Sequence, residues 1–158
     1  MGGDRGRGSR RAQKRRHARA DRRRPPGDPG GVSVVADASV IVELLADPDS
    51  QLFERRDLRT SWAPHLLDAE VGHALRRRVA AGTVPGEQAR RAISRLARLP
   101  VRRAPHAELL GRAWELRENV TFYDALYVAL AERLDVPLLT LDERLAAAPG
   151  PRCVIEIP

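Results

Sequence analysis

The sequence contains a single cysteine and a single lysine among its 158 residues. Because Cys153 has no second cysteine, an internal disulfide and a cysteine-based zinc site are excluded, which fits a reducing cytoplasm. The only lysine, Lys14, lies in a basic N-terminal stretch. Phosphoacceptor domains gather acids at strand ends but generally rely on a lysine, so this class is disfavoured.

Several motifs and long apolar runs are also missing. No stretch approaches the roughly 18 apolar residues of a membrane span, and no signal-peptide pattern appears, so we expect a cytoplasmic protein without a membrane partner. The four histidines show no metal-ligand spacing. No G-x-S-x-G elbow, glycine-rich phosphate loop or G-x-G-x-x-G follows a strand, which argues against serine hydrolases and nucleotide-binding folds.

Positive charge is concentrated at the N-terminus. Residues 1–31 hold 11 Arg or Lys and 3 Asp, whereas residues 32–158 hold 17 Arg and 18 Asp or Glu. With almost nothing to bury, residues 1–31 are expected to be a disordered basic tail, and residues 32–158 one domain. The tail could hold nucleic acid through phosphate contacts, or it could reflect a misplaced translation start, with the domain beginning near Val32 or Val34.

Short apolar runs alternate with helical patterns along the rest of the chain. We expect strands at 32–36, 60–63, 101–104, 138–141 and 153–157, and helices at 39–46, 50–58, 65–81, 85–99, 106–118, 122–134 and 144–148. This alternation indicates βαβ units, and therefore an α/β fold with a parallel sheet covered on both faces. Ligands of such sheets bind outside the carboxyl ends of the strands, where Asp37 and Asp142 are placed.

Glu70 is the most informative single residue. It falls within the apolar stripe of helix 65–81, four residues after Leu66 and four before Ala74. Burying an unpaired carboxylate costs several kcal/mol, so Glu70 must meet a cation or lie at the edge of a cleft. A partner arginine and a functional site both satisfy this requirement.

Three further acids have equally good structural interpretations. Asp37 and Asp142 can cap helices, and Asp124 suits the first turn of helix 122–134, with Thr121 as its cap. Capping alone does not explain, however, why three acids lie at strand ends or helix starts while a fourth, Glu70, faces inward. Carboxylates gathered without His or Cys favour Mg²⁺ or Mn²⁺, which can activate a water against a phosphodiester.

At these residues the chain resembles the PIN-domain ribonucleases, specifically the VapC-type toxins of bacterial toxin–antitoxin pairs. The resemblance runs through residues 34–39, 70–77, 119–132 and 139–142, and covers essentially all of 32–158 but none of the tail. It implies a three-layer α/β/α fold, metal-dependent endoribonuclease activity, a homodimer and an antitoxin that blocks the site.

The resemblance also implies roles for individual residues. Asp37, Glu70, Asp124 and Asp142 become the acidic metal-binding and catalytic set, with Asp142 acting directly or through water, and two hydroxyl residues, Ser39 and Thr140, become supporting positions. The expected activity is cleavage of RNA with Mg²⁺ as cofactor, and Mn²⁺ as the alternative ion. The alternative is a PIN-like module that binds RNA or a partner without cutting.

Deleting residues 1–31 is expected to leave the fold, the turnover at saturating RNA and the cut site unchanged, because residues 32–158 contain every predicted strand and helix and all the acids that the proposed mechanism uses. Weaker RNA binding at low salt is the only expected loss, since phosphate contacts release counterions. Circular dichroism, cleavage kinetics and mapping of RNA ends test this. Misfolding or a changed cut site would contradict the domain boundary.

Overall fold

The structure is a computed structural model that describes residues 33–47 and 58–158. The predicted disordered tail and nearly all of the predicted helix 50–58 lie outside the described residues. The domain boundary at residue 32 therefore stays a prediction.

The described chain contains short parallel strands and longer helices. In chain order the elements are β1 (Val35–Ala36), α1 (Ala38–Ala46), the 3₁₀ helix η1 (Leu58–Thr60), β2 (Trp62–Pro64), α2 (Leu67–Ala80), α3 (Gly86–Leu96), β3 (Arg102–Ala104), α4 (Leu110–Glu115), α5 (Phe122–Leu134), β4 (Leu138–Leu139), α6 (Glu143–Ala147) and β5 (Ile155–Glu156).

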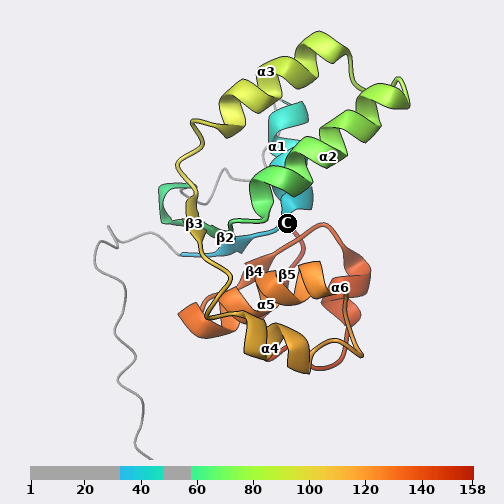
Figure 1. The fold of residues 1–158 in the computed structure, drawn as a ribbon. Helices are drawn as coiled ribbons and strands as arrows, with labels where there is room; N and C mark the ends of the chain where they lie inside the picture. The colour runs from blue at the N-terminus through green and yellow to red at the C-terminus, as the bar shows by residue number, and fades with distance from the viewer. Residues whose placement is uncertain (1–32, 48–57) are drawn as a thin grey trace, which may run out of the picture.

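The strands form one parallel sheet in the order β3-β2-β1-β4-β5. The chain builds outward from β1 to β3, then returns to place β4 on the other side of β1. Helices α1 to α3 lie on one side of the sheet and α4 to α6 on the other (Figure 1). The predicted three-layer α/β/α fold is confirmed. Its reversal between β1 and β4 is the position at which such sheets bind ligands.

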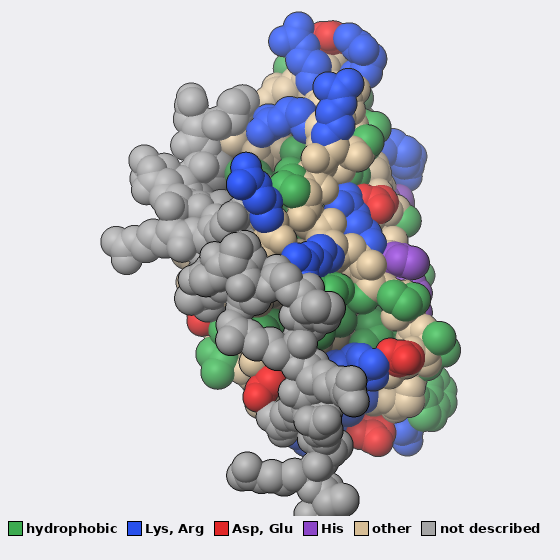
Figure 2. All heavy atoms as spheres, turned by 90° about the vertical axis from the view of Figure 1, so that its left-hand side faces the viewer, with side chains coloured by type: hydrophobic (Ala, Val, Ile, Leu, Met, Phe, Trp, Pro, Cys, Tyr) green, Lys and Arg blue, Asp and Glu red, His purple; other side chains and the backbone are tan. Residues whose placement is uncertain are grey.

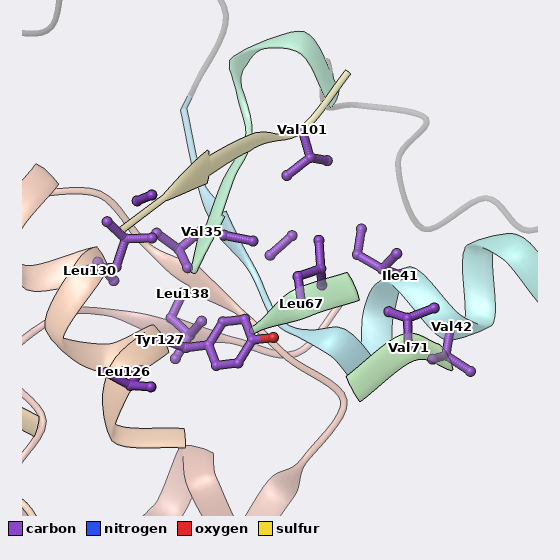
Figure 3. Packing of buried hydrophobic residues seen from close by; sticks show 14 of the residues in the cluster. Val35, Ile41, Val42, Leu67, Val71, Val101, Leu126, Tyr127, Leu130 and Leu138 are labelled. Carbon is purple, nitrogen blue, oxygen red and sulfur yellow. The ribbon is translucent and has the colours of Figure 1, made fainter. Parts of the chain in front are cut away.

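Helix α5 forms the centre of one face, where it contacts β1, β2 and β4. Thr121 caps its first turn, and Asp135, with φ of 57°, ends it in the left-handed conformation. Seven consecutive residues from Ala125 to Ala131 are buried, as expected for a helix enclosed by the sheet and α4. Among them, Tyr127 lies in the middle of the core with its hydroxyl directed toward α2 (Figure 3).

The strands expected over 32–36 and 138–141 are shorter in the structure, at Val35–Ala36 and Leu138–Leu139, and two further elements differ. The helix expected over 106–118 is regular only over Leu110–Glu115, because turns occupy the chain on either side. Strand β2 includes Pro64, whereas the sequence predicts that the strand ends before it. Pro64 has no N–H group, but pairing with β3 does not depend on one there, because the next donor, His65 N–H, bonds to Ala104 O at 2.9 Å.

Helix α3 turns its arginines to solvent, as its periodicity predicts. Arg90, Arg91 and Arg95 are exposed, as is Arg98 just after the helix, whereas Ala92 is buried. Arginine side chains gather over the upper part of the face in Figure 2, where α3 lies. Within the described residues, no helix is both long and apolar enough to cross a membrane.

A network centred on Arg112 ties α4 and α5 to the chain before β5. The Arg112 guanidinium donates to Glu132 through Nε at 2.7 Å and Nη2 at 3.0 Å, and Nη2 also reaches Gly150 O at 2.8 Å. The Glu132 carboxylate accepts a further bond from Arg152 N–H at 2.7 Å. Burial alone would raise the pKa of Glu132, but the Arg112 guanidinium and the Arg152 amide outweigh it and hold this pKa below its usual value.

Replacing Glu132→Gln is expected to lower the free energy of unfolding at neutral pH by about 1–3 kcal/mol, because the Glu132 side chain is only 12% exposed and its charged partner remains. Since the folded-state pKa is lowered, this contribution is present above the unfolded value of 4.5 and disappears as the pH falls through the folded value. Urea unfolding at neutral and acid pH measures the change.

Glu115→Gln is the matched control. Its carboxylate contacts the same Arg112, at 3.0 Å, but is 63% exposed, so its replacement is expected to cost less than about 1 kcal/mol. Equal costs for the two variants, or a Glu132→Gln deficit that does not change with pH, would contradict this assignment.

Candidate active site

Asp37 lies directly after β1 and is 8% exposed. Its Oδ1 accepts from Ala38 N–H at 2.7 Å, which caps helix α1. Its Oδ2 accepts from the hydroxyls of Ser39, at 2.6 Å, and Thr140, at 2.8 Å. Oδ2 also accepts from Ser39 N–H, at 3.4 Å. The structural interpretation of Asp37 as a cap and the functional one are therefore compatible, because the carboxylate that caps the helix is also held by two hydroxyl groups.

The two hydroxyl residues join the carboxyl ends of β1 and β4. Besides donating to Asp37, Ser39 Oγ accepts from Leu141 N–H at 3.0 Å. Thr140 Oγ1 accepts from Asp142 N–H at 3.1 Å. Both side chains therefore hold the loop after β4 against Asp37.

Glu70 is half-buried in the first turn of α2, and it bonds to a tyrosine rather than an arginine. Tyr127 Oη donates to Glu70 Oε2 at 2.6 Å. No arginine among the described residues forms a salt bridge with Glu70. The partner-arginine interpretation is thus wrong for the described part of the chain.

Asp124 and Asp142 are each held at the start of a helix. Thr121 Oγ1 donates to Asp124 Oδ2 at 2.6 Å and accepts from Asp124 N–H at 3.2 Å, a reciprocal cap of α5. Asp142 Oδ1 accepts from the N–H groups of Arg144, at 2.8 Å, and Leu145, at 3.3 Å, and so caps α6.

Three of the four predicted acids line one cleft of about 970 Å³. Asp37, Glu70 and Asp124 reach it from β1, α2 and α5, respectively, whereas Asp142 is not part of its lining. The structure therefore brings three of the predicted site residues to one cleft and leaves the fourth beside it.

The carboxylates nevertheless interact as one set. Burial raises the pKa of Glu70, the Tyr127 hydrogen bond opposes this rise, and the charges of Asp37 and Asp124 add to it. Burial likewise raises the pKa of Asp124, against the Thr121 hydrogen bond, and the charges of Asp37 and Asp142 increase it further. Asp142 thus affects the site through its charge, although it does not line the cleft.

The donor set suits a hard divalent cation. In the described part of the chain, no three His, Cys, Asp or Glu side chains stand close enough together to enclose a metal ion. Mg²⁺ does not need such a cage, because it keeps several waters and is commonly bound through one or two carboxylates. Oxygen ligands in a cleft where carboxylates raise one another's pKa fit that mode of binding.

Comparison with known proteins agrees with this arrangement. A family model described as PIN domain matches residues 34–151, which includes all four acids. The chain belongs to the PIN-domain family. Ribonuclease VapC1 of Mycobacterium tuberculosis is 54% identical to this PIN domain over 127 residues, which cover 78% of this chain and 96% of the relative.

Solved structures share the fold of this PIN domain. The crystal structure of PAE2754 from Pyrobaculum aerophilum has a TM-score of 0.59 at 30% identity, covering 78% of this chain and 83% of that one. VapBC-5 of Mycobacterium tuberculosis, a member of the VapBC family of toxin–antitoxin systems, has a TM-score of 0.52 at 24% identity, covering 80% and 97%.

Tyr127 is the site residue of the PIN domain that sequence reasoning missed. Its position within an apolar helix suggests a core residue, and its ring is indeed fully buried. The available signal was the hydroxyl, because a buried tyrosine needs a hydrogen-bond partner. Burial and the charge of Glu70 raise the pKa of Tyr127 far above its usual range, so it remains a proton donor to Glu70.

Tyr127→Phe is expected to lower the free energy of unfolding by about 1.5–3 kcal/mol at neutral pH, because it removes a hydrogen bond to a half-buried carboxylate. Chemical denaturation measures the loss. Tyr123→Phe removes a hydroxyl from a ring that is 60% exposed, and serves as the control with a change within about 0.5 kcal/mol. Equal stability of Tyr127→Phe and the unmodified protein would contradict the role given to this bond.

Proposed function

We propose that the chain is a Mg²⁺-dependent endoribonuclease, with Mn²⁺ as a possible substitute, and the toxin component of a type II toxin–antitoxin system. The observation that supports this most is the convergence of Asp37, Glu70 and Asp124 on one cleft at the carboxyl ends of β1 and β2 and the start of α5. This cleft belongs to a chain that is 54% identical to a protein named as a ribonuclease.

Asp37, Glu70 and Asp124 are the residues that would hold the ion, directly or through water. When bound, the ion supplies an activated water and offsets negative charge on the scissile phosphodiester. Asp142 does not line the cleft, but its charge would add to the negative electrostatic potential of the site, as its effect on the pKa of Asp124 indicates.

The chain's own contribution is to hold these carboxylates in place before substrate arrives. Asp37 is oriented by Ser39 and Thr140, Glu70 by Tyr127, and Asp124 by Thr121. Groups fixed in advance need no reorganisation during the reaction, which is how a rigid site lowers a barrier. Glu70 and Asp124 accept these bonds on one carboxylate oxygen each. Asp37 accepts on both, but Oδ1 takes only the bond from Ala38 N–H, so all three carboxylates keep a lone pair for a ligand.

The same proposal includes two protein partners. A protein antitoxin would block the cleft, in keeping with the family and with the toxin–antitoxin systems among structures of the same fold. A homodimer is proposed on the resemblance to VapC toxins alone. Light scattering of the purified chain measures its oligomeric state.

Asp124→Asn is expected to abolish Mg²⁺-dependent cleavage of RNA while leaving the metal-free protein as stable as the unmodified chain, or more so. The amide oxygen can still accept from Thr121, and the repulsion by Asp37 and Asp142 is removed. Gel analysis of RNA after incubation with Mg²⁺, and separately with EDTA, measures cleavage, and denaturation without metal measures stability.

Glu143→Gln provides the control, since this exposed acid follows Asp142 and does not line the cleft. Its variant should cleave normally. Cleavage that persists in EDTA would contradict the metal dependence, and absence of cleavage in every RNA tested would favour a binding module. A loss of about 1 kcal/mol in metal-free Asp124→Asn would show that Asp124 acts mainly as a cap.

A further inference from the structure

The cleft has a basic wall beyond its acids. On α2, His73 and Arg77 follow Glu70 by three and seven residues, so the three side chains share one helix face. All three line the cleft. At 1.5 Å per residue, Arg77 lies roughly 10 Å along the helix axis from Glu70.

Arg77 is available to a ligand, whereas the next arginine is not. Arg78 Nη2 is paired with Glu43 Oε2 at 3.1 Å. Arg77 is exposed and forms no ion pair with any acid in the described part of the chain. An unpaired guanidinium that lines an acidic cleft is suited to a phosphate, which it can contact through two N–H groups.

The cleft also carries an aromatic ring, beside Asp124. Tyr123 directly precedes Asp124, is 60% exposed and lines the cleft. The neighbouring Phe122 is 40% exposed but does not line it. An exposed ring beside the acids offers a flat surface on which a nucleobase can stack, an interaction that every base can make.

We propose that one RNA strand crosses this cleft with a base stacked on Tyr123 and a backbone phosphate bound by Arg77, so that the intervening phosphodiester passes over Asp37, Glu70 and Asp124. The proposal rests on the proposed ribonuclease function and assigns substrate contacts within the same cleft. Tyr123 and Arg77 are binding residues here, and neither takes part in the chemical step.

Each contact has a matched control beside it in the sequence. Arg76 is also exposed and unpaired among the described residues, but it lines a different groove, between α2 and α3. Arg76→Ala therefore removes the same charge from the same helix without touching the cleft. Phe122→Ala likewise removes a neighbouring exposed ring, and Tyr123→Phe keeps the stacking surface while removing the hydroxyl.

Binding is measured by fluorescence anisotropy with a labelled single-stranded oligoribonucleotide of mixed sequence, in Mg²⁺ and about 0.15 M salt, where charges beyond about 8 Å are screened. All variants carry Asp124→Asn in the full chain, so that cleavage is removed and residues 1–31 contribute equally. Thermal unfolding of each variant serves as the control for folding, and these exposed substitutions are expected to leave the unfolding temperature nearly unchanged.

Tyr123→Ala is expected to weaken binding at least about fivefold, while Tyr123→Phe and Phe122→Ala stay within about twofold. Arg77→Ala is expected to weaken binding about three- to tenfold, while Arg76→Ala stays within about twofold. The number of phosphate contacts obtained from the salt dependence of binding should fall by about one in Arg77→Ala. With Asp124 restored, both cleft variants should raise KM more than they lower kcat.

Equal affinities for Arg77→Ala and Arg76→Ala, or for Tyr123→Ala and Phe122→Ala, would overturn the proposed strand path. The proposed ribonuclease function is tested separately by cleavage in the unmodified chain. Absence of cleavage together with the expected binding differences would retain the strand path and reject the nuclease, because the binding comparison does not depend on cleavage.

Discussion

The hydrogen bonds that hold Asp37 between the ends of β1 and β4 are the interactions on which the rest of the site depends. Strands this short cannot fix a loop by themselves, since β1 and β4 have two residues each. Ser39 and Thr140 join the two loops through the Asp37 carboxylate, at the reversal of strand order where an open sheet offers a crevice. Helices α2 and α5 then bring Glu70 and Asp124 to the same crevice.

This convergence places negative charges where burial and mutual repulsion both disfavour ionisation. Tyr127 and Thr121 each supply one hydrogen bond that opposes the rise in pKa, yet the pKa values of Glu70 and Asp124 remain raised. In the proposed metal-dependent enzyme, a bound cation would offset this repulsion and stabilise the folded protein. The basic wall at Arg77 lies further along α2, where it can attract an anion without neutralising the acids.

Much of this arrangement follows from the sequence because the acids occupy positions that local rules define. Asp37 follows an apolar run, and Glu70 interrupts an apolar stripe, so the positions of both could be predicted without knowledge of any tertiary contact. The partner of Tyr127 could not be predicted, since it is 57 residues away, and the need of a buried tyrosine for a hydrogen-bond partner does not indicate which residue supplies it. The sequence predicts too long a helix over 106–118, because the apolar periodicity continues through the turns on either side of α4. It does not predict that Asp142 lies outside the cleft, because that depends on the conformation of the loop after β4.

A crystal soaked in Mn²⁺ tests the central claim most directly, because anomalous scattering locates this metal independently of any activity. We expect an anomalous peak in the cleft among the carboxylates of Asp37, Glu70 and Asp124, and none there in crystals of Asp124→Asn. A cleft that stays empty at saturating Mn²⁺, while the ion binds elsewhere or not at all, would contradict a metal site at these residues.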